Sequence, residues 1–467
     1  MSSKFVKITD QTIKELVDIF GRENVSTQKN ELEAYSHDEM PFATPHNPQI
    51  VVKPDNVKSI ARFMCLANKK KIPVTPRGAG TGLSGGCVPL FGGILISFER
   101  MNKILEIDKK NSVEVVEAGV TLSDICNSVV EQGLYYPVHI GEMTSTIGGI
   151  ISTNAGGMNA VKYGVTRHNV LGLEAVMPNG ETIKTGGRFA KCSTGYDITQ
   201  LLIGSEGTLA IITKAILKLT TKPGKKNVLL APFMQLENAL DAIPEILDLE
   251  MIPTGVEFME RSILELVEKY QKIKIPYLQH QAYLMITIEE ESDDQTCDYF
   301  AKVEEICRRY EAVDAVIPGS GKAQRKLIDA REQFYHAIKQ HSPMVVIDVV
   351  VPRSAIKEFV IRAKAKSAEM QIPLIVYGHA GDGNVHLHPC CENIARSEWI
   401  RKIPHLVSEI YKIGTSLGGA ISGEHGIGYD KKVYFQNEAE TPLYNAMKAI
   451  KKAFDPNGIL NPGKLFD

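Results

Sequence analysis

Apolar and polar positions alternate along this chain in short segments that glycine and proline separate. Residues 10–20 carry apolar side chains at helical spacing, and Gly21 follows them as a stop signal. The same spacing predicts a helix over residues 56–70, between short apolar runs at 50–53 and 72–75 that predict strands. Helices and strands are therefore mixed in this part of the chain.

A β-hairpin is predicted further along, where turn residues stand between two apolar runs. Residues 171–177 and 181–184 form the runs, and Pro178, Asn179 and Gly180 supply the turn. Other strands are predicted at 94–98, 113–118, 209–213 and 215–219, and another helix at 122–132.

A polar stretch at residues 221–226 contains a Pro-Gly pair and marks a candidate domain boundary. Beyond it the glycine density falls, and longer helical patterns alternate with apolar strands. This order predicts an α+β layer with its helices on one face of the sheet. The elements expected there are strands at 228–231 and 282–288 and helices at 236–249 and 296–310.

Length, charge and composition limit the classes of protein that these elements can form. A chain of 467 residues is too long for a single hydrophobic core, so two or three domains are expected. Its 53 Lys and Arg residues balance 55 Asp and Glu residues, so we expect no nucleic-acid partner and no anionic membrane surface. The longest apolar runs fall short of a transmembrane segment, and no leader pattern opens the sequence. A cytoplasmic location is therefore expected.

The cysteine pattern bears on redox chemistry. The eight cysteines include no C-x-x-C pair, and the adjacent Cys390 and Cys391 suit neither a zinc site nor a cluster. They are expected to be reduced and mostly buried, as in cytosolic proteins. The chain is thus expected to carry no iron–sulfur cluster of its own. Any electrons that it takes up must pass to another molecule.

Two glycine-rich loops indicate a ligand. Residues 76–86, the first glycine loop, match G-x-G-x-x-G, but Pro89 and two glycine pairs prevent the helix that a nicotinamide Rossmann site requires. The backbone N–H groups of this loop can instead wrap a pyrophosphate. The second glycine loop, residues 145–157, lets the backbone approach a flat group closely. Together the loops favour a long dinucleotide over the alternative, an ordinary glycine-rich surface.

Four histidines and a glutamate gather in two glycine-bounded motifs near the end of the chain. His379 and His386 flank a tight turn, and His386 and His388 face one side of a strand. Glu424 offers a carboxylate oxygen beside His425. Imidazoles and a carboxylate can bind one divalent ion, with Zn²⁺, Fe²⁺ and Mn²⁺ all open, and a further imidazole can accept a proton. The alternative is a set of histidines that serve packing and hydrogen bonding alone.

These motifs resemble, in order along nearly the whole chain, FAD-binding proteins of the p-cresol-methylhydroxylase type. Within that family they resemble the branch of the D-lactate dehydrogenases, the glycolate oxidase FAD subunit and D-2-hydroxyglutarate dehydrogenase. The resemblance implies an α+β fold. It comprises a two-subdomain FAD-binding domain (1–222), an α+β cap or substrate domain with an antiparallel sheet (223–417), and a C-terminal segment (418–467) that returns to the flavin. The matching stretches are residues 76–86, 146–157, 204–208, 378–388, 422–428 and 455–464.

The resemblance also implies which residues bind FAD. Residues 77–82 and Ser84 would hold the pyrophosphate, and Asn461 would reach back to the isoalloxazine. Residues 138–144 depart from the proline-rich pattern that the family often has before the second loop. The full implied set is Pro76, Arg77, Gly78, Ala79, Gly80, Thr81, Gly82, Ser84, Thr144, Ser145, Gly148, Gly149, Asn154, Ala155, Gly157, Ile211 and Asn461.

For the chemistry, the resemblance implies His379, His386 and Glu424 as metal ligands and His425 as the base. Oxidation of a 2-hydroxy acid removes the hydroxyl proton and sends the Cα hydrogen to flavin N5 as hydride. A metal ion on the hydroxyl oxygen lowers its pKa. A nearby imidazole that takes the proton typically contributes ~10²–10⁴-fold to the rate.

The substrate carboxylate needs a cation, for which a guanidinium is best suited. Arg331 occupies the family's position for this role, although its local sequence alone favours a surface arginine paired with an acid. Tyr335, Asn384 and His388 are the other substrate candidates, with packing as the alternative for Tyr335. Residues 345–348 lack the lysine of relatives with larger substrates, so small monocarboxylates are expected, D-lactate first and glycolate second.

Two other classes of function stay open. One is a flavin electron-transfer or regulatory subunit without substrate chemistry, against which the metal motif argues. The other is an oxidase that uses oxygen directly. The sequence does not encode the electron acceptor, and an electron-transferring flavoprotein, a quinone and an iron–sulfur subunit are the candidates.

Overall fold

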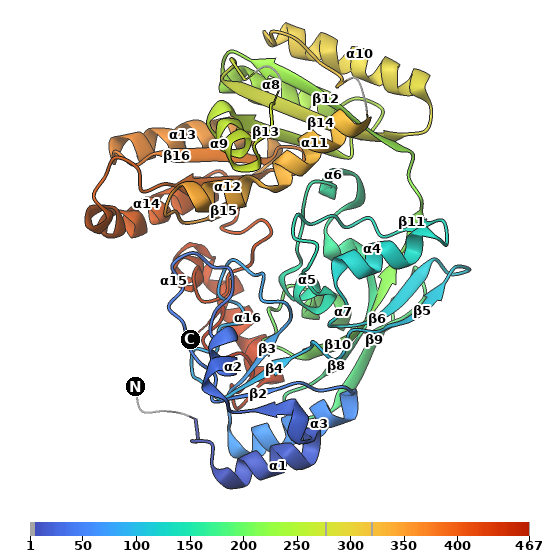
Figure 1. The fold of residues 1–467 in the computed structure, drawn as a ribbon, viewed down its shortest axis with the longest axis vertical. Coiled ribbons are helices and arrows are strands. Elements are labelled where there is room, and N and C mark those ends of the chain that lie inside the picture. The colour runs from blue at the N-terminus through green and yellow to red at the C-terminus, as the bar shows by residue number, and fades with distance from the viewer. Residues whose placement is uncertain (1–4, 276–277, 319–320, 467) are drawn as a thin grey trace.

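The computed structural model describes residues 5–275, 278–318 and 321–466. Figure 1 shows two lobes, a lower one formed by the N-terminal part of the chain and an upper one formed by most of the remainder. The chain ends in the lower lobe, where its last helices (red) lie near the first strands. None of the helices in the described ranges is both long enough and apolar enough to cross a membrane.

The lower lobe begins with a small mixed sheet of order β1–β2–β4–β3. The two helices predicted beside it are confirmed: α1 (Asp10–Phe20) is capped by the Thr9 side chain and α3 (Val57–Lys70) by that of Asn56. The strand predicted at 72–75 begins and ends two residues later, so its end leads directly into the first glycine loop. The strands are β1 (Val25–Ser26), β2 (Ile50–Val52), β3 (Val74–Arg77) and β4 (Ile94–Ser97).

A five-stranded antiparallel sheet of order β5–β6–β10–β8–β9 completes the lower lobe. The predicted hairpin is confirmed as β8 and β9. The strands predicted at 209–213 and 215–219 form one strand, β10. A register shift between Ile212 and Lys214 interrupts its regular alternation, so the sequence pattern divides it into two strands. The strands are β5 (Ile104–Asp108), which the pattern does not predict, β6 (Val113–Glu117), β8 (Val170–Val176), β9 (Thr182–Gly186) and β10 (Ile211–Lys218).

The sequence pattern does not predict α5 (Ile147–Thr153), because the glycines of this helix are typical of a loop. The helix lies inside the second glycine loop. A Cβ at Gly148 would lie 2.9 Å from the Ala118 side chain, so glycine lets this helix approach the sheet closely. The remaining elements of this lobe are α2 (Lys29–Ala34), α4 (Leu122–Val130), β7 (Leu134–Tyr135), α6 (Ala160–Tyr163), α7 (Ile198–Leu202), β11 (Thr220–Thr221) and α16 (Thr441–Phe454). α15 (Lys432–Glu438) contacts both lobes, with Phe435 against Tyr444 of α16 and Tyr434 against the upper-lobe core.

The upper lobe is a six-stranded antiparallel sheet of order β12–β14–β13–β16–β17–β15. Its strands are β12 (Lys225–Phe233), β13 (Gly255–Glu260), β14 (Ala282–Glu290), β15 (Ile347–Val350), β16 (Leu374–His379) and β17 (Asn384–Pro389). The antiparallel sheet expected for the cap is confirmed.

Helices cover both faces of this sheet, so the prediction of helices on one face was wrong. Consecutive residues of β12 pack in different cores, Leu229 with one set of helices and Leu230 with the other. The continuous apolar run at 228–231 already fits a sheet buried on both sides. One face carries α8 (Leu236–Leu247), α10 (Asp293–Arg309), α13 (Ile356–Glu369) and α14 (Arg396–Ser416); the other carries α9 (Arg261–Gln271), α11 (Gly321–Glu332) and α12 (Phe334–His341).

The end of the chain is anchored in the lower lobe. Leu460 forms a parallel bridge with Val74 of β3, and both Ile459 and Leu460 are buried in the core of that lobe. The last segment thus returns to the strand that precedes the first glycine loop. The domain limits at 222 and 417 remain predictions.

Candidate functional site

A cavity of about 340 Å³ lies between the lobes. Its lining comes from the two glycine loops of the lower lobe, from the cap, and from the segment that follows residue 421. The predicted dinucleotide loops and the predicted histidine cluster therefore line one cavity, although 300 positions separate Gly86 from His386.

The first glycine loop leaves the end of β3 with free backbone donors. Among the described residues, the N–H groups of residues 78–82 find no hydrogen-bond partner, and these residues line the cavity. A Cβ at Gly78 would overlap Thr146 Oγ1, and Gly80 has a φ of 80°, which favours glycine. A run of free N–H groups of this kind fits a pyrophosphate without the help of a helix.

All but two of the residues implied for FAD line the cavity. The exceptions are Thr144, whose hydroxyl donates to Glu142, and Asn154, which ends α5 with a φ of 51° and accepts the Arg167 N–H. The implied residues in the lining are Pro76, Arg77, Gly78, Ala79, Gly80, Thr81, Gly82, Ser84, Ser145, Gly148, Gly149, Ala155, Gly157, Ile211 and Asn461.

Two of these residues also hold the C-terminal segment against the cavity. The Ser84 hydroxyl lies 3.1 Å from each carbonyl oxygen of residues 425–426. The Asn461 amide donates to the Glu206 carbonyl at 2.8 Å. The carboxylate of Glu206, which lies in the matching stretch 204–208 but was given no role from sequence, accepts the N–H groups of residues 427–428 at 2.7 Å. The glycine loops and the histidine-bearing segment are thus joined by direct hydrogen bonds.

His379, His386 and Glu424 meet on the cavity wall. His379 ends β16, His386 lies in the adjacent β17, and Glu424 Oε1 lies 3.5 Å from His379 Nε2 and 3.3 Å from His386 Nε2. Two donors about 2.0–2.1 Å from one ion at the tetrahedral angle are ~3.3 Å apart, so the spacing fits a divalent ion. Burial opposes the charged form of Glu424, but the two imidazoles hold the pKa of its carboxyl well below its usual range.

Glu257 supports this group from behind, and the sequence analysis missed it. It lies opposite His379 in the pairing of β13 with β16, and its Oε1 is 2.7 Å from His379 Nδ1. Its Oε2 accepts the Arg331 Nε at 2.8 Å. Burial opposes its charge, but His379 and Arg331 hold the pKa of Glu257 below its usual value. The available signal was a lone acid inside the apolar strand 255–259, since a buried carboxylate needs partners.

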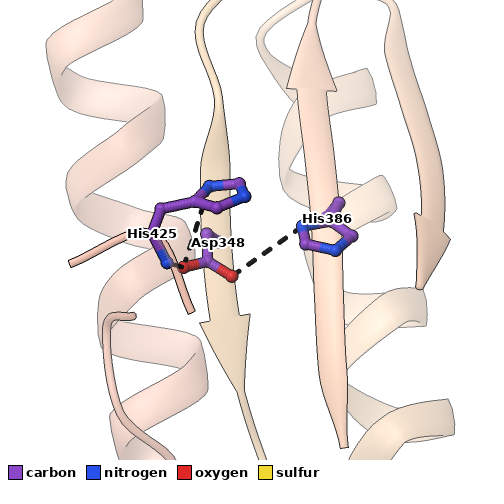
Figure 2. Close-up of side chains that lie close together, drawn as sticks. All are labelled: Asp348, His386 and His425. Atoms are coloured by element: carbon purple, nitrogen blue, oxygen red, sulfur yellow. Dashed lines mark hydrogen bonds and ion pairs between the residues drawn. The ribbon is translucent and has the colours of Figure 1, made fainter. Parts of the chain in front are cut away.

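Asp348 fixes the loop that carries His425. Figure 2 shows its carboxylate between the rings of His386 and His425, whose Nδ1 atoms each lie 3.8 Å from it. Its Oδ2 accepts the Ser422 hydroxyl and the N–H groups of the next three residues at 2.9–3.1 Å. Its Oδ1 accepts the Asn384 amide at 2.7 Å. This nest of donors sets the position of the whole Glu-His motif.

Asp348, His386 and His425 also lie close enough together to hold an ion. Oδ2 of Asp348 already accepts four hydrogen bonds and Oδ1 accepts one, so the group of His379, His386 and Glu424 is the better metal site. Burial opposes ionisation of Asp348, but His425, Lys431 and His386 hold the pKa of its carboxyl well below its usual range.

His425 faces the cavity as an uncharged ring. Burial lowers the pKa of His425 to about 4, against the opposing charge of Asp348. Its buried Nδ1 has no hydrogen-bond partner among the described residues. His388 lines the cavity as well: burial puts its pKa well below the usual value, and its Nε2 lies 3.0 Å from the Tyr377 hydroxyl. Both rings are therefore free bases at neutral pH.

Arg331 lies in α11 but is not a surface arginine, because only 7% of it is exposed. Its guanidinium carbon lies 5.1 Å from the Phe334 ring centre and 4.7 Å from that of Tyr377. Nη2 lies 2.7 Å from Glu257 Oε2 but lacks hydrogen-bond geometry and has no other partner among the described residues. Because Arg331 lines the cavity, a ligand there can still reach its guanidinium.

The other substrate candidates differ in position. Tyr335 lines the cavity, and its hydroxyl donates to the Glu39 carbonyl at 2.9 Å, across the two lobes. Asn384 is not among the described residues that line the cavity, because its amide donates to Asp348 and to the Val349 carbonyl. Val346 contributes an apolar side chain to the lining, within the segment where a lysine is missing.

Two models of known protein families match this chain, one in each of its two main parts. The model of the FAD binding domain matches residues 48–186, and that of the C-terminal domain of FAD linked oxidases matches residues 222–465. The glycolate oxidase subunit GlcD of Bacillus subtilis is 38% identical, over 98% of this chain and 97% of its own. A D-lactate dehydrogenase of Archaeoglobus fulgidus is 39% identical, over 93% of this chain and 95% of its own.

A solved structure confirms the expected fold. p-Cresol methylhydroxylase with substrate bound covers 98% of this chain and 97% of its own with a TM-score of 0.78 at 17% identity. The family model and the fold together support FAD as the cofactor. The chain belongs to the FAD-linked oxidase family and is an oxidoreductase of the D-lactate, glycolate and D-2-hydroxyglutarate dehydrogenase type.

Proposed function

We propose that this chain is an FAD-dependent dehydrogenase of small D-2-hydroxy acids, with the conversion of D-lactate to pyruvate as its first candidate reaction. One observation carries the proposal: the glycine loops, the buried Arg331 and the group of His379, His386 and Glu424 line a single cavity. A flavin electron carrier without substrate chemistry needs neither a buried cation nor a metal group beside the flavin.

Carboxylate binding and proton transfer are assigned to different side chains. Arg331, which lines the cavity, binds the substrate carboxylate through guanidinium N–H groups that Glu257 does not engage. The neutral ring of His425 takes the hydroxyl proton at an unprotonated nitrogen. When bound, FAD supplies the acceptor for the substrate's electron pair, and a divalent ion at His379, His386 and Glu424 supplies charge that favours loss of that proton. Zn²⁺, Fe²⁺ and Mn²⁺ are the candidate ions.

The size of the substrate follows from the charges of the cavity. The described lining of the cavity includes two guanidinium groups, those of Arg77 and Arg331, and Arg77 belongs to the first glycine loop. A second carboxylate, as in 2-hydroxyglutarate, would face the apolar Val346 without a cation of its own. Glycolate is the second candidate, since it differs from lactate by one methyl group and a relative with 38% identity is named for glycolate oxidation.

We further propose a protein electron acceptor, such as an electron-transferring flavoprotein, and a cytoplasmic location. All eight cysteines are free thiols in the described chain, but only Cys307 and Cys390 are buried, so the expectation of mostly buried cysteines was wrong. Free thiols suit a reducing compartment. The cysteine pattern predicts no iron–sulfur cluster, so the electrons of the flavin need another acceptor.

The test is anaerobic mixing of the flavin-loaded protein with single hydroxy acids, together with elemental analysis. D-Lactate is expected to bleach the oxidised flavin absorbance, glycolate more slowly, and L-lactate and D-2-hydroxyglutarate least. One metal ion per chain is expected. Absence of bleaching by every hydroxy acid in metal-replete protein would favour a carrier, and stoichiometric peroxide in air would favour an oxidase.

A further inference from the structure

We propose that Glu257 is a positioning residue that couples carboxylate binding at Arg331 to metal binding at His379. The inference rests on the proposed function, because it takes Arg331 as the carboxylate anchor and His379 as a metal ligand. It concerns how one buried acid makes these two sites depend on each other.

Glu257 divides its two oxygens between the two sites. Oε1 lies 2.7 Å from His379 Nδ1, while Oε2 lies 2.8 Å from Arg331 Nε and 2.7 Å from Nη2. Only 1% of the residue is exposed, so bulk water does not compete for either oxygen. Its place in β13, directly opposite His379 of β16, fixes the carboxylate by the register of the sheet.

A carboxylate shared in this way transmits changes from one partner to the other. An imidazole that donates its Nδ1–H to a carboxylate is a stronger metal ligand through Nε2. Arg331 draws negative charge away from Glu257 and so weakens this effect at His379. A ligand carboxylate that engages the guanidinium leaves more of the Glu257 charge to His379. Carboxylate and metal binding should therefore favour each other, and thermodynamic linkage makes the effect reciprocal.

The guanidinium is held so that it can serve two carboxylates at once. The rings of Phe334 and Tyr377 lie 5.1 and 4.7 Å from its central carbon, and Arg331 lines the cavity while Glu257 holds its Nε and Nη2 side. A ligand can thus bind Arg331 without first displacing Glu257. The coupling arises because His379 and Arg331 share the negative charge of Glu257, and it requires no conformational change.

The experiment is a double-variant cycle read out as metal affinity. The flavin-loaded protein is stripped of metal, and Zn²⁺ affinity is measured by competition with a chelating dye for the wild type, Glu257→Gln, Arg331→Gln and the double variant. Glu257→Gln is expected to weaken Zn²⁺ binding by about 10–100-fold. Arg331→Gln is expected to strengthen it by about 5-fold or more when Glu257 is present, and to leave it unchanged in the Glu257→Gln background.

Two results would overturn the proposal. One is an equal effect of Arg331→Gln in both backgrounds, which is what direct repulsion between guanidinium and metal ion predicts. The other is a Glu257→Gln variant with wild-type affinity. Each single variant leaves a buried charge without its partner and is at risk of misfolding. The double variant removes both charges, and on its own it is expected to bind Zn²⁺ at least about 10-fold more weakly than the wild type.

Glu332→Gln provides the matched control. Glu332 follows Arg331 and lines the same cavity, but its carboxylate lies 2.7 Å from His139 Nε2 on the lower lobe. Its replacement is expected to leave Zn²⁺ affinity unchanged, and a loss equal to that of Glu257→Gln would contradict a specific role for Glu257. The cycle uses no hydroxy acid, so a failure of the proposed substrate appears in the flavin-reduction test alone.

Discussion

Replacement of Asp348 by asparagine is expected to destabilise the loop that carries the Glu-His motif. The carboxylate uses Oδ2 for the Ser422 hydroxyl and three N–H groups, and Oδ1 for the Asn384 amide. Asparagine offers one oxygen and one NH₂ group. If its oxygen faces the loop, its NH₂ meets the Asn384 NH₂; if it is turned over, its NH₂ meets the loop donors. Either orientation leaves a buried donor without an acceptor.

The size of the effect follows from these contacts. A hydrogen bond to a charged group contributes roughly 1.5–3 kcal/mol, and loss of one partner from a buried charged group costs about 3–5 kcal/mol. Lys431, which is 1% exposed and lies 3.5 Å from Oδ2, also loses its counter-charge. We therefore expect the free energy of unfolding to fall by about 3–5 kcal/mol.

Urea unfolding of the flavin-loaded protein measures this change. Trp399, the single tryptophan of the chain, is 2% exposed in α14 of the same lobe, so its fluorescence reports the unfolding of that lobe. Asp241→Asn is the matched control, since its pair with Lys357 is more than one-third exposed and should matter by less than about 1 kcal/mol. If Asp348→Asn differs from the wild type by no more than this control, the assigned role of the donor nest is incorrect.

Three further predictions concern the cofactor and the base. His425→Ala should slow flavin reduction by D-lactate by ~10²–10⁴-fold while the flavin spectrum is retained, and unchanged stopped-flow rates would remove His425 as the base. Gly78→Ala should weaken FAD binding in flavin titrations, because its Cβ would overlap Thr146 Oγ1, whereas Gly321→Ala, with nothing within 4 Å of its Cβ, should not. The rate of flavin reduction should stay level between about pH 8 and 5.5 and fall only as the pH approaches the His425 pKa of about 4. Below that pH the ring is protonated and cannot accept the hydroxyl proton. A midpoint near 6.5 in the pH profile of the rate would contradict this pKa of His425.

Local patterns anticipated much of the lower lobe. The capped helices α1 and α3 and the hairpin of β8 and β9 were predicted close to their observed bounds, because their periodicity and turn residues lie within one segment. Departures occur where distant packing overrides that signal. Gly148 of α5 is explained by the close approach of this helix to Ala118, and the upper sheet is covered on both faces because strand order brings two sets of helices to it.

Part of the candidate site was likewise readable from sequence. The first glycine loop, the turn between His379 and His386, and the adjacent Glu424 and His425 stand out because their residue types are unusual and their spacing is short. Ser84 lines the cavity, whereas Asn384 is not among the residues of its described lining. Ser84 donates to the backbone of the histidine-bearing segment, and Asn384 donates to Asp348, because hydrogen bonds between distant segments leave no trace in local spacing.

The sequence by itself determined the glycine loops, the clustered histidines and the family to which they point, since each of these is a local arrangement of residue types. Only the tertiary structure decided which acids support those histidines. Glu257 is 122 positions from His379, and Asp348 is 77 positions from His425. Strand register and loop closure bring them together, and burial makes each contact strong because bulk water cannot compete for the charges. Arg331, for which the local sequence alone favoured a surface position, is buried for the same reason: its environment is set by β13 and by the aromatic rings of Phe334 and Tyr377, not by its neighbours in the chain.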